Sequence, residues 1–365
     1  MPNQLEVSDP SIKIGKTFAV QPLSAKFLSQ LISMGPFVFQ TARCLKKMGF
    51  LSSIYQTANE GLSEAELQLK LQLSSYSVEV LVDAGVSCKL LVKEFGKVYL
   101  TEVGYFIQFD EITEVNMNFS QDVCYQGLFF LEQALKSNEA VGLKHFGDWT
   151  TIYEGLTKLP ETALRSWFAF DHFYSDGAFP RVFPYVFADN PKKILDIGGN
   201  TGKFAISCAQ ANLAVSITLV DHPRQVEIAK ENVRLADLSE RITFYACDLL
   251  NENTELPKGY DAIWMSQFLD CFSEEQIIYL LKKVKASLNP GGSIFIMETF
   301  TDNQKFDSAK FCLDMTSLYF TAMANGKSRM YPMAKFVELI EKADLKVSNT
   351  FENIRLFHTI LKCQL

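Results

Sequence analysis

The sequence predicts an α/β protein: a doubly wound, mostly parallel sheet of seven strands follows a mainly helical N-terminal half. The run at 194–204, ILDIGGNTGKF, is a short apolar segment that ends in an acid and enters a glycine-rich turn. From Pro191 onward, β-branched runs alternate with helical patterns, as in parallel strands joined by crossover helices. Before Pro191, apolar residues recur at helical spacing around a single hairpin pattern.

Composition sets the first limits on function. With 365 residues, 48% of them apolar and 21% charged, the chain can fold as two globular domains. A net charge of −7 argues against a nucleic-acid partner, which needs clustered cations. No apolar stretch approaches the ~20 residues that cross a bilayer, so we expect no membrane partner.

The compartment is predicted from the N-terminus and the cysteines. Residues 1–16 lack the basic start and apolar run of a signal peptide, which favours a cytoplasmic protein. The eight cysteines are scattered without a CxxC pair, so we expect buried thiols in a reducing compartment and neither a metal site nor a disulfide framework.

The N-terminal elements begin with an amphipathic helix over 27–50. Ser63, with Glu66 three residues on, has the pattern of a capping box. A helix over 74–86 is expected to end at Gly85, and a two-stranded hairpin over 89–100 follows.

Two helices followed by a hairpin are the elements of a winged helix. The helix that would enter a major groove, SSYSVEVLVDAG, carries Glu79 and Asp83 and no Lys or Arg. Because such a surface repels phosphate, we expect dimerisation rather than DNA binding. We predict a winged-helix-like dimerisation domain over 1–106, a helical connector over 107–190 and a sheet domain over 191–365.

The connector contains an aromatic segment, WFAFDHFYSDGAFPRVFPYVF, at 167–187, with polar positions at Asp171, His172, Ser175 and Asp176. It is interpreted either as a helix packed between domains or as a substrate wall. Ligand pockets favour domain interfaces and aromatic linings.

The sheet domain contains five strand patterns, a last helix and a terminal antiparallel pair. The tight turn Asn289-Pro290-Gly291-Gly292 precedes the fifth strand. The strands are expected at 193–197, 216–220, 242–246, 262–266 and 293–298, the helix at 333–343, and the pair at 345–350 and 356–363.

The glycine turn predicts a nucleotide-sized site. Gly198 and Gly199 allow close approach of a ligand, and Gly202 allows close packing of helix on strand. Asp221, after the second strand, is placed to accept ribose hydroxyls, which would suit NAD equally. However, Asp196 at the mouth of the turn would repel a diphosphate and suits a cationic amino-acid group.

Taken in order, these motifs resemble class I S-adenosylmethionine-dependent methyltransferases, and more closely the small-molecule O-methyltransferases that pair a winged-helix dimerisation domain with a Rossmann-like domain. LDIGGNTG, LVDHP, CDLL, LNPGGSIFIME and the N-terminal LSEAEL and VYLTEVG carry the resemblance over nearly the whole chain. It implies S-adenosyl-L-methionine as cofactor, a homodimer, and a cofactor site of Asp196, Gly198, Gly199, Gly202, Asp221, Asp248, Leu249, Ser266 and Phe272.

Within this resemblance, Asp196 and Gly198 border the methionine part, Asp221 holds the ribose, and Asp248 with Leu249 holds the adenine. Phe272 stands where the family has a Trp. The segment FDHFYSD resembles a substrate-contacting stretch in which Tyr174 replaces a Met. The expected substrate contacts are Phe170, Asp171, His172, Tyr174 and Asp314.

The catalytic pattern departs from the family. Asp270 stands at the position of the family's catalytic His, Cys271 at the following Asp, and Glu298 matches an acid that orients the His. A second family acid, expected near Tyr331, is absent. Proton transfer from a phenol (pKa ~10) to an ordinary Asp (pKa ~3.9) is uphill by about 8 kcal/mol.

Three interpretations of Asp270 stay open. It is a base whose pKa is raised by burial or by the charge of Glu298, it orients an acceptor that is already nucleophilic, or the site no longer methylates. His172 is the one credible substitute base, although a helix-surface His explains it more simply.

The resemblance favours O-methylation of a small, aromatic or phenolic acceptor. Ring C-methylation of a phenol is the alternative, because it needs a weaker base. A regulator or cofactor-binding scaffold on the same fold is the alternative from another class.

Overall fold

The computed structural model describes residues 17–20, 22–57, 60–355 and 358–365. The prediction about a signal peptide falls on 1–16, outside these residues. The chain divides into two compact units, which meet in sequence between Ser120 and Gln121. No helix in the described part of the chain combines the length and hydropathy needed to cross a membrane.

The first unit is mainly helical. Its core contains Leu45, Phe50, Leu67, Val82 and Leu91, all of which are almost fully buried. Its elements are α1 (Ala25–Ser33), α2 (Gly35–Lys47), α3 (Phe50–Tyr55), α4 (Glu64–Leu71), α5 (Ser75–Ser87), β1 (Leu91–Glu94), β2 (Lys97–Leu100), α6 (Glu102–Phe109) and α7 (Glu111–Phe119).

The predicted helix over 27–50 is wrong as a single element. It is divided into α1 and α2, because the first helix ends at Met34 and Pro36 lies in the first turn of α2. Proline suits a first turn because its missing N–H has no intrahelical partner there.

Ser63 caps α4 as predicted: its Oγ accepts from the Glu66 backbone at 3.2 Å, and Glu66 returns a bond to the Ser63 N–H at 2.7 Å. The predicted helix end at Gly85 is wrong, since α5 continues to Ser87. Gly85 is instead a close-packing position, where a Cβ would lie 2.7 Å from Leu91 and 2.9 Å from Leu45.

The second unit begins with short helical elements. The segment at 167–187 is not one helix but the end of α10, a 3-10 turn and α11, whose Phe179, Val182 and Phe183 enter the sheet's core. The elements are η1 (Ser120–Cys124), in which the chain passes between the units, η2 (Gly127–Phe130), α8 (Leu131–Ser137), η3 (Val141–His145), α9 (Ile152–Gly155), η4 (Leu156–Lys158), α10 (Glu161–Ser175), η5 (Asp176–Ala178) and α11 (Phe179–Val186).

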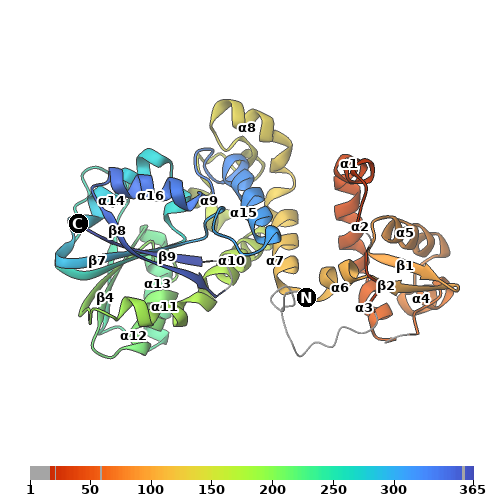
Figure 1. Cartoon of the computed structure of the whole chain (residues 1–365), viewed down its shortest axis with the longest axis horizontal. Helices are drawn as coiled ribbons and strands as arrows, with labels where there is room; N and C mark the ends of the chain where they lie inside the picture. The colour runs from red at the N-terminus through yellow and green to blue at the C-terminus, as the bar shows by residue number, and fades with distance from the viewer. Residues whose placement is uncertain (1–16, 21, 58–59, 356–357) are drawn as a thin grey trace. The chain divides into compact units, whose positions relative to one another are not determined.

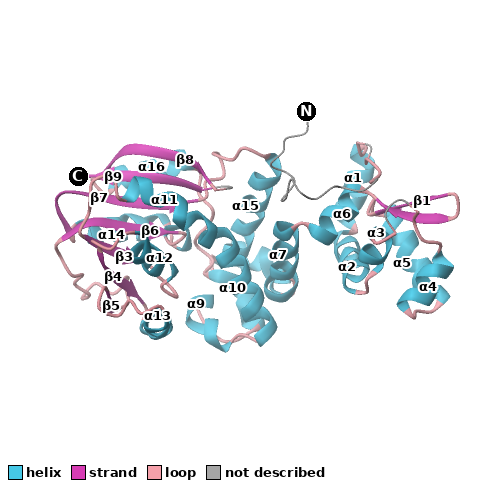
Figure 2. Cartoon of the chain, turned by 90° about the horizontal axis from the view of Figure 1, so that it is seen from below, coloured by secondary structure: helices cyan, strands magenta, loops and turns pink. Residues whose placement is uncertain are grey.

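A seven-stranded sheet follows in the order β5-β4-β3-β6-β7-β9-β8, which Figure 2 shows from one edge to the other. β9 is antiparallel to both of its neighbours, β7 and β8, and the other strand pairs of this sheet are parallel. Its elements are β3 (Lys193–Ile197), α12 (Lys203–Ala211), β4 (Ser216–Asp221), α13 (Pro223–Leu235), β5 (Ile242–Ala246), β6 (Tyr260–Ser266), η6 (Leu269–Cys271), α14 (Glu274–Lys285), β7 (Leu288–Glu298), α15 (Asp307–Tyr319), η7 (Phe320–Ala324), α16 (Met333–Lys342), β8 (Lys346–Ile354) and β9 (His358–Gln364).

The doubly wound sheet is confirmed, with local differences in the strand bounds. β6 begins at Tyr260 rather than at 262, and β8 continues to Ile354 rather than ending at 350. Pairing in β7 starts at Leu288, so the predicted turn at Asn289–Gly292 is an irregular stretch of the strand, with a register shift opposite Tyr260 and Ala262. The described part of the predicted last strand begins at His358, since 356–357 lie outside the described residues.

Helices cover both faces of this sheet. Figure 1 shows α14 and α16 on one face and α11, α12 and α13 on the other, and each layer has its own apolar core against the sheet. The chain winds from β3 outward to β4 and β5, then returns to β6 on the other side of β3. The crevice at the carboxyl ends of β3 and β6 is therefore the topological switch point, where such sheets bind ligands.

Candidate active site

Polar residues end five neighbouring strands in one row. Asp248 follows β5, Asp221 ends β4, Asp196 lies near the end of β3, Ser266 ends β6 and Glu298 ends β7. Since adjacent strands lie about 4.8 Å apart, the row forms an elongated polar edge rather than one cluster. An extended ligand can therefore meet these residues in succession.

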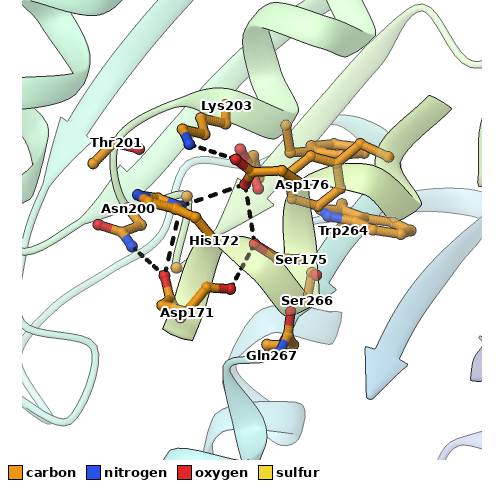
Figure 3. A pocket seen from close by; sticks show the side chains of 15 residues that line it. Asp171, His172, Ser175, Asp176, Asn200, Thr201, Lys203, Trp264, Ser266 and Gln267 are labelled. Carbon is orange, nitrogen blue, oxygen red and sulfur yellow. Dashed lines mark hydrogen bonds and ion pairs between the residues drawn. The ribbon is translucent and has the colours of Figure 1, made fainter. Parts of the chain in front are cut away.

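A cleft of about 480 Å³, partly open to solvent, lies at the centre of this row. Figure 3 shows side chains of α10 and η5 facing the loop that follows β3. The lining residues are Asp171, His172, Ser175, Asp176, Phe179, Asp196, Gly198, Gly199, Asn200, Thr201, Lys203, Phe204, Trp264, Ser266 and Gln267.

Four of the lining residues carry buried side-chain oxygens without a partner in the described structure: Asp196 Oδ2, Asn200 Oδ1, Ser266 Oγ and Gln267 Oε1. Asp196 is only 2% exposed. Burial, together with the nearby charge of Asp221, holds the pKa of Asp196 well above its usual range. An uncompensated carboxylate in a cleft is costly unless a cation or donor joins it, so this end of the cleft suits a positively charged group.

The glycine loop is held against β4. Gly198 donates to the Val220 carbonyl at 2.9 Å, and Asp221 accepts from the backbone of Asn200 at 2.8 Å and of His222 at 2.6 Å. Burial raises the pKa of Asp221, and these two backbone bonds oppose the rise. Asp221 therefore fixes the loop, and each oxygen keeps a second lone pair toward a ligand.

Gly198 has a φ of +70°, and a Cβ there would lie 2.3 Å from the Phe268 ring. A Cβ on Gly199 would lie 2.5 Å from Leu219. Both positions therefore require glycine for space. Gly202, with a φ of +83°, begins α12 and lies close to Ala229, as expected for helix packing.

The polar end of α10 faces this loop. His172 Nδ1 lies 3.3 Å from Asp176 and 3.9 Å from Asp171, and Asn200 donates to Asp171 at 3.2 Å. Lys203 forms an ion pair with Asp176 across the cleft. Burial raises the pKa of Asp171 to about 6, although the charge of His172 opposes the rise.

Lys203 and Asn200 are cleft residues that sequence reasoning missed. Both stand inside the glycine motif, so their position alone was a signal. Asp176 was recognised only as a polar position, because its partner Lys203 lies on a different element.

Asp270 and Glu298 lie on adjacent elements, η6 and the end of β7. Glu298 Oε1 accepts from the backbones of Phe268 at 3.1 Å and Leu269 at 3.0 Å, whereas Oε2 is buried without a partner in the described residues. Burial, followed by the charge of Asp270, holds the pKa of Glu298 well above its usual range.

Asp270 is 6% exposed, and burial raises its pKa to about 7. The thiol of Cys271, which donates to Asp270 at 3.5 Å, opposes the rise. The negative charge of Asp171 raises the pKa of Asp270 further. The predicted repulsion between Asp270 and Glu298 raises the pKa of Glu298 instead.

A further polar group surrounds Cys271. Tyr153 is hydrogen-bonded to the Cys271 thiol, and its hydroxyl pKa is raised well above normal by burial. Trp167 Nε1 donates to the Tyr319 hydroxyl at 2.8 Å. Tyr153 and Tyr319 were missed from the sequence, because single tyrosines in helices have no recognisable pattern.

The remaining predicted residues are dispersed. Phe170 packs against the buried Tyr174 at 5.0 Å between ring centroids. Phe272 packs edge-on against Phe268 at 4.8 Å. Asp314 pairs with Lys310 at 2.5 Å on α15, outside the cleft described above.

The predicted adenine pair lies beside β5. Asp248 is exposed and accepts from the Leu250 backbone at 2.9 Å. The Leu249 side chain is 6% exposed and belongs to the core.

Comparison with known proteins agrees with this geometry. Residues 186–345 match the O-methyltransferase domain family, and residues 26–97 match the Dimerisation2-like domain family. An L-tyrosine C(3)-methyltransferase of Streptomyces lavendulae is 25% identical over 298 residues, which are 80% of each chain. A 3-hydroxy-5-methyl-1-naphthoate 3-O-methyltransferase of Streptomyces sahachiroi is 30% identical over 127 residues, 34% of this chain and 36% of that one.

Solved structures share the fold over almost the whole chain. The apo form of the S-adenosylmethionine-dependent methyltransferase SibL superposes with a TM-score of 0.71 at 21% identity, covering 92% of this chain and 99% of that one. Mitomycin 7-O-methyltransferase MmcR gives a TM-score of 0.69 at 15% identity, covering 93% and 97%.

The sheet, the glycine cradle and the carboxylate row define a class I S-adenosylmethionine-dependent methyltransferase. Within that class, residues 186–345 match the O-methyltransferase domain family and residues 26–97 a Dimerisation2-like domain, the domain pair of a small-molecule O-methyltransferase.

The cleft fits S-adenosyl-L-methionine. The unpartnered Asp196 oxygen provides for a cationic amino-acid group, and Gly198 and Gly199 line the cleft beside it without side chains. No lysine or arginine other than Lys203 lines the described cleft, so little there would favour a diphosphate.

Proposed function

We propose that the protein transfers the methyl group of S-adenosyl-L-methionine to a small phenolic acceptor. The observation that carries this proposal is a buried carboxylate, Asp270, with a pKa raised to about 7 at the carboxyl edge of the sheet. The two relatives named above support a phenolic acceptor, since their names state L-tyrosine and a hydroxynaphthoate.

In this proposal the cofactor extends along the carboxylate row. Asp248 and Leu249 hold the adenine, Asp221 the ribose, and Asp196 with Gly198 the methionine part. Gly199, Gly202, Ser266 and Phe272 complete the cofactor site. Once bound, the cofactor supplies an electrophilic methyl group, and the protein holds the acceptor in line with it and excludes water.

Asp270 is the general base for O-methylation. A carboxylate whose pKa is near 7 is half ionised at neutral pH and is a far better acceptor of a phenolic proton than an ordinary Asp. Glu298 accepts two backbone bonds from the loop that carries Asp270, so we assign it a positioning role. Phe170, Asp171, His172, Tyr174 and Asp314 remain the proposed substrate contacts.

Ring C-methylation is the second candidate. The relative that covers 80% of this chain is named a C-methyltransferase, and the chain has Asp270 where the family has its catalytic His. A phenol that is deprotonated activates its ring carbons, so the same carboxylate serves both reactions.

We also propose a homodimer formed through a winged-helix-like N-terminal domain. The support is the match to a Dimerisation2-like domain and an apolar surface on α1 and α2, where Ile32 is 79% and Phe37 is 69% exposed. A monomer in sedimentation would contradict it. The proposed location is the cytoplasm, supported by eight cysteines, none of which forms a disulfide in the described structure.

The test is a panel of hydroxylated benzoates, phenols and tyrosine, incubated with cofactor that carries a ¹³C-labelled methyl group. We expect at least one phenol to gain the label. The ¹³C chemical shift of the product distinguishes a methoxyl from an aryl methyl group. If S-adenosylhomocysteine binds but no phenol is labelled, the acceptor class is wrong.

A further inference from the structure

The cleft beside the glycine loop carries cations as well as carboxylates. Lys203 Nζ pairs with Asp176 Oδ2, and His172 Nδ1 lies 3.3 Å from Asp176 Oδ1. Asp171 and Asp196 also line the cleft, and Asn200 donates to the Asp171 carboxylate at 3.2 Å. The amino-acid end of the cofactor is a zwitterion, and the cleft presents both signs to it.

We propose that Lys203 binds the carboxylate of the cofactor's methionine group and exchanges its partner, Asp176, for that carboxylate when the cofactor enters. This proposal rests on the cofactor assignment and adds residues to it.

The position of Lys203 favours an anion. It is the first residue of α12, a helix of nine residues whose first turn contains no acidic side chain. The partial positive charge of the helix N-terminus therefore adds to that of the ammonium group. In this structure the anion paired with Lys203 is Asp176, which belongs to η5 and not to the glycine loop.

The ion pair can be exchanged at low cost. The Lys203 side chain is 43% exposed and that of Asp176 is 35% exposed, so the present pair is partly hydrated and worth little. Asp176 also keeps other partners, since Ser175 donates to it at 3.1 Å and His172 lies beside it. Releasing Lys203 thus leaves Asp176 satisfied.

Two ligands separate this role from a structural one. S-adenosylhomocysteine contains the methionine-derived carboxylate, whereas 5′-methylthioadenosine has the same nucleoside and sulfur without the amino-acid group. Titration calorimetry of both ligands should show Lys203→Gln weakening S-adenosylhomocysteine by about fivefold or more. Methylthioadenosine should bind Lys203→Gln and the wild type equally, within twofold.

Asp176→Asn gives the complementary result. Because it removes the competing carboxylate, we expect S-adenosylhomocysteine to bind this variant as tightly as the wild type or more tightly. Lys230→Gln is the matched control, since Lys230 pairs with Glu227 at 2.7 Å on α13 and should leave both affinities unchanged. Circular dichroism checks that each variant is folded.

The outcomes that overturn the proposal are distinct. Unchanged S-adenosylhomocysteine affinity in Lys203→Gln would show that Lys203 does not bind the ligand. Equal weakening of both ligands, or a loss in Asp176→Asn as large as in Lys203→Gln, would make the pair a structural link across the cleft. A wild-type protein that bound neither ligand would overturn the cofactor assignment as well.

Discussion

Two pairs of acids lie at the same edge of the sheet, and they differ in the surroundings of the acid that does not hold a loop. At the ends of β3 and β4, Asp221 accepts two backbone bonds and Asp196 keeps an unpartnered oxygen in an open cleft. At η6 and the end of β7, Glu298 accepts the backbone bonds, and Asp270 carries a pKa of about 7.

In each pair one acid accepts backbone bonds from a loop, and we assign the other a role in ligand binding or proton transfer. The orphaned oxygen of Asp196 faces a cleft, where a ligand can supply the missing positive charge. Asp270 lies near another acid, Asp171, and accepts from the Cys271 thiol and from backbone N–H groups, and burial raises its pKa to about 7, so a proton neutralises it near neutral pH. The same residue type therefore suits cation binding in one place and proton transfer in the other.

The sharpest test of this difference is Asp270→Asn. We expect kcat to fall by about 10²- to 10⁴-fold, because the variant removes a general base. Because the wild-type carboxylate must be ionised to accept a proton, wild-type kcat should rise with pH up to the pKa of about 7 and level off above it. The residual activity of the variant should lack this step. Steady-state kinetics between pH 5.5 and 9 would measure both, with pH values chosen by us as about the range around that pKa.

The control is binding. S-adenosylhomocysteine should bind Asp270→Asn as it binds the wild type, because Asp270 does not belong to the proposed cofactor site. Unchanged turnover on the true acceptor would remove Asp270 from the mechanism and favour an acceptor that is already ionised.

The second test compares two acids of the cofactor row. Asp221→Asn should weaken S-adenosylhomocysteine by about 10- to 100-fold, because a buried carboxylate loses charge-assisted bonds to both loop and ligand. Asp248→Asn, at an exposed position, should cost about fivefold or less. Calorimetry measures the S-adenosylhomocysteine affinity of both variants. Equal losses of affinity would mean that burial does not set the strength of these contacts.

The last test concerns the folding stability of the glycine cradle rather than ligand binding or turnover. Gly198→Ala combines a φ of +70° with a Cβ 2.3 Å from Phe268, so we expect a loss of about 2–3 kcal/mol of unfolding free energy. Gly96→Ala, with a φ of +75° and nothing within 4 Å, isolates the backbone strain at about 1 kcal/mol. Denaturant titration measures both, and equal losses would show that the contact with Phe268 relaxes freely.

The sequence predicted the sheet well because its information is local. Each strand pattern is followed within a few residues by its own turn and acid, as in Asp196 with Gly198. Predicted element boundaries were wrong where a residue type has two common roles. Glycine often ends a helix, but Gly85 lies inside α5 and packs closely against Leu45. Pro36 marked the break between α1 and α2, and the helical periodicity on both sides concealed it.

The site was predictable only in part for the same reason. The acids of the row follow strands and are therefore recognisable in sequence. The ion pair of Lys203 with Asp176 joins two elements, and the link between Tyr153 and Cys271 joins residues more than a hundred positions apart. Such contacts form only when the helices pack together, so no local sequence pattern predicts them.

The order of strands in the sheet has a consequence for folding. The carboxylate row draws on β5, β4, β3, β6 and β7, so it is complete only after every one of these parallel pairings, which are distant in sequence, has formed. A partly formed sheet does not contain the full carboxylate row. A ligand that spans it will bind the finished domain alone, and by mass action will protect that domain against heat and proteases.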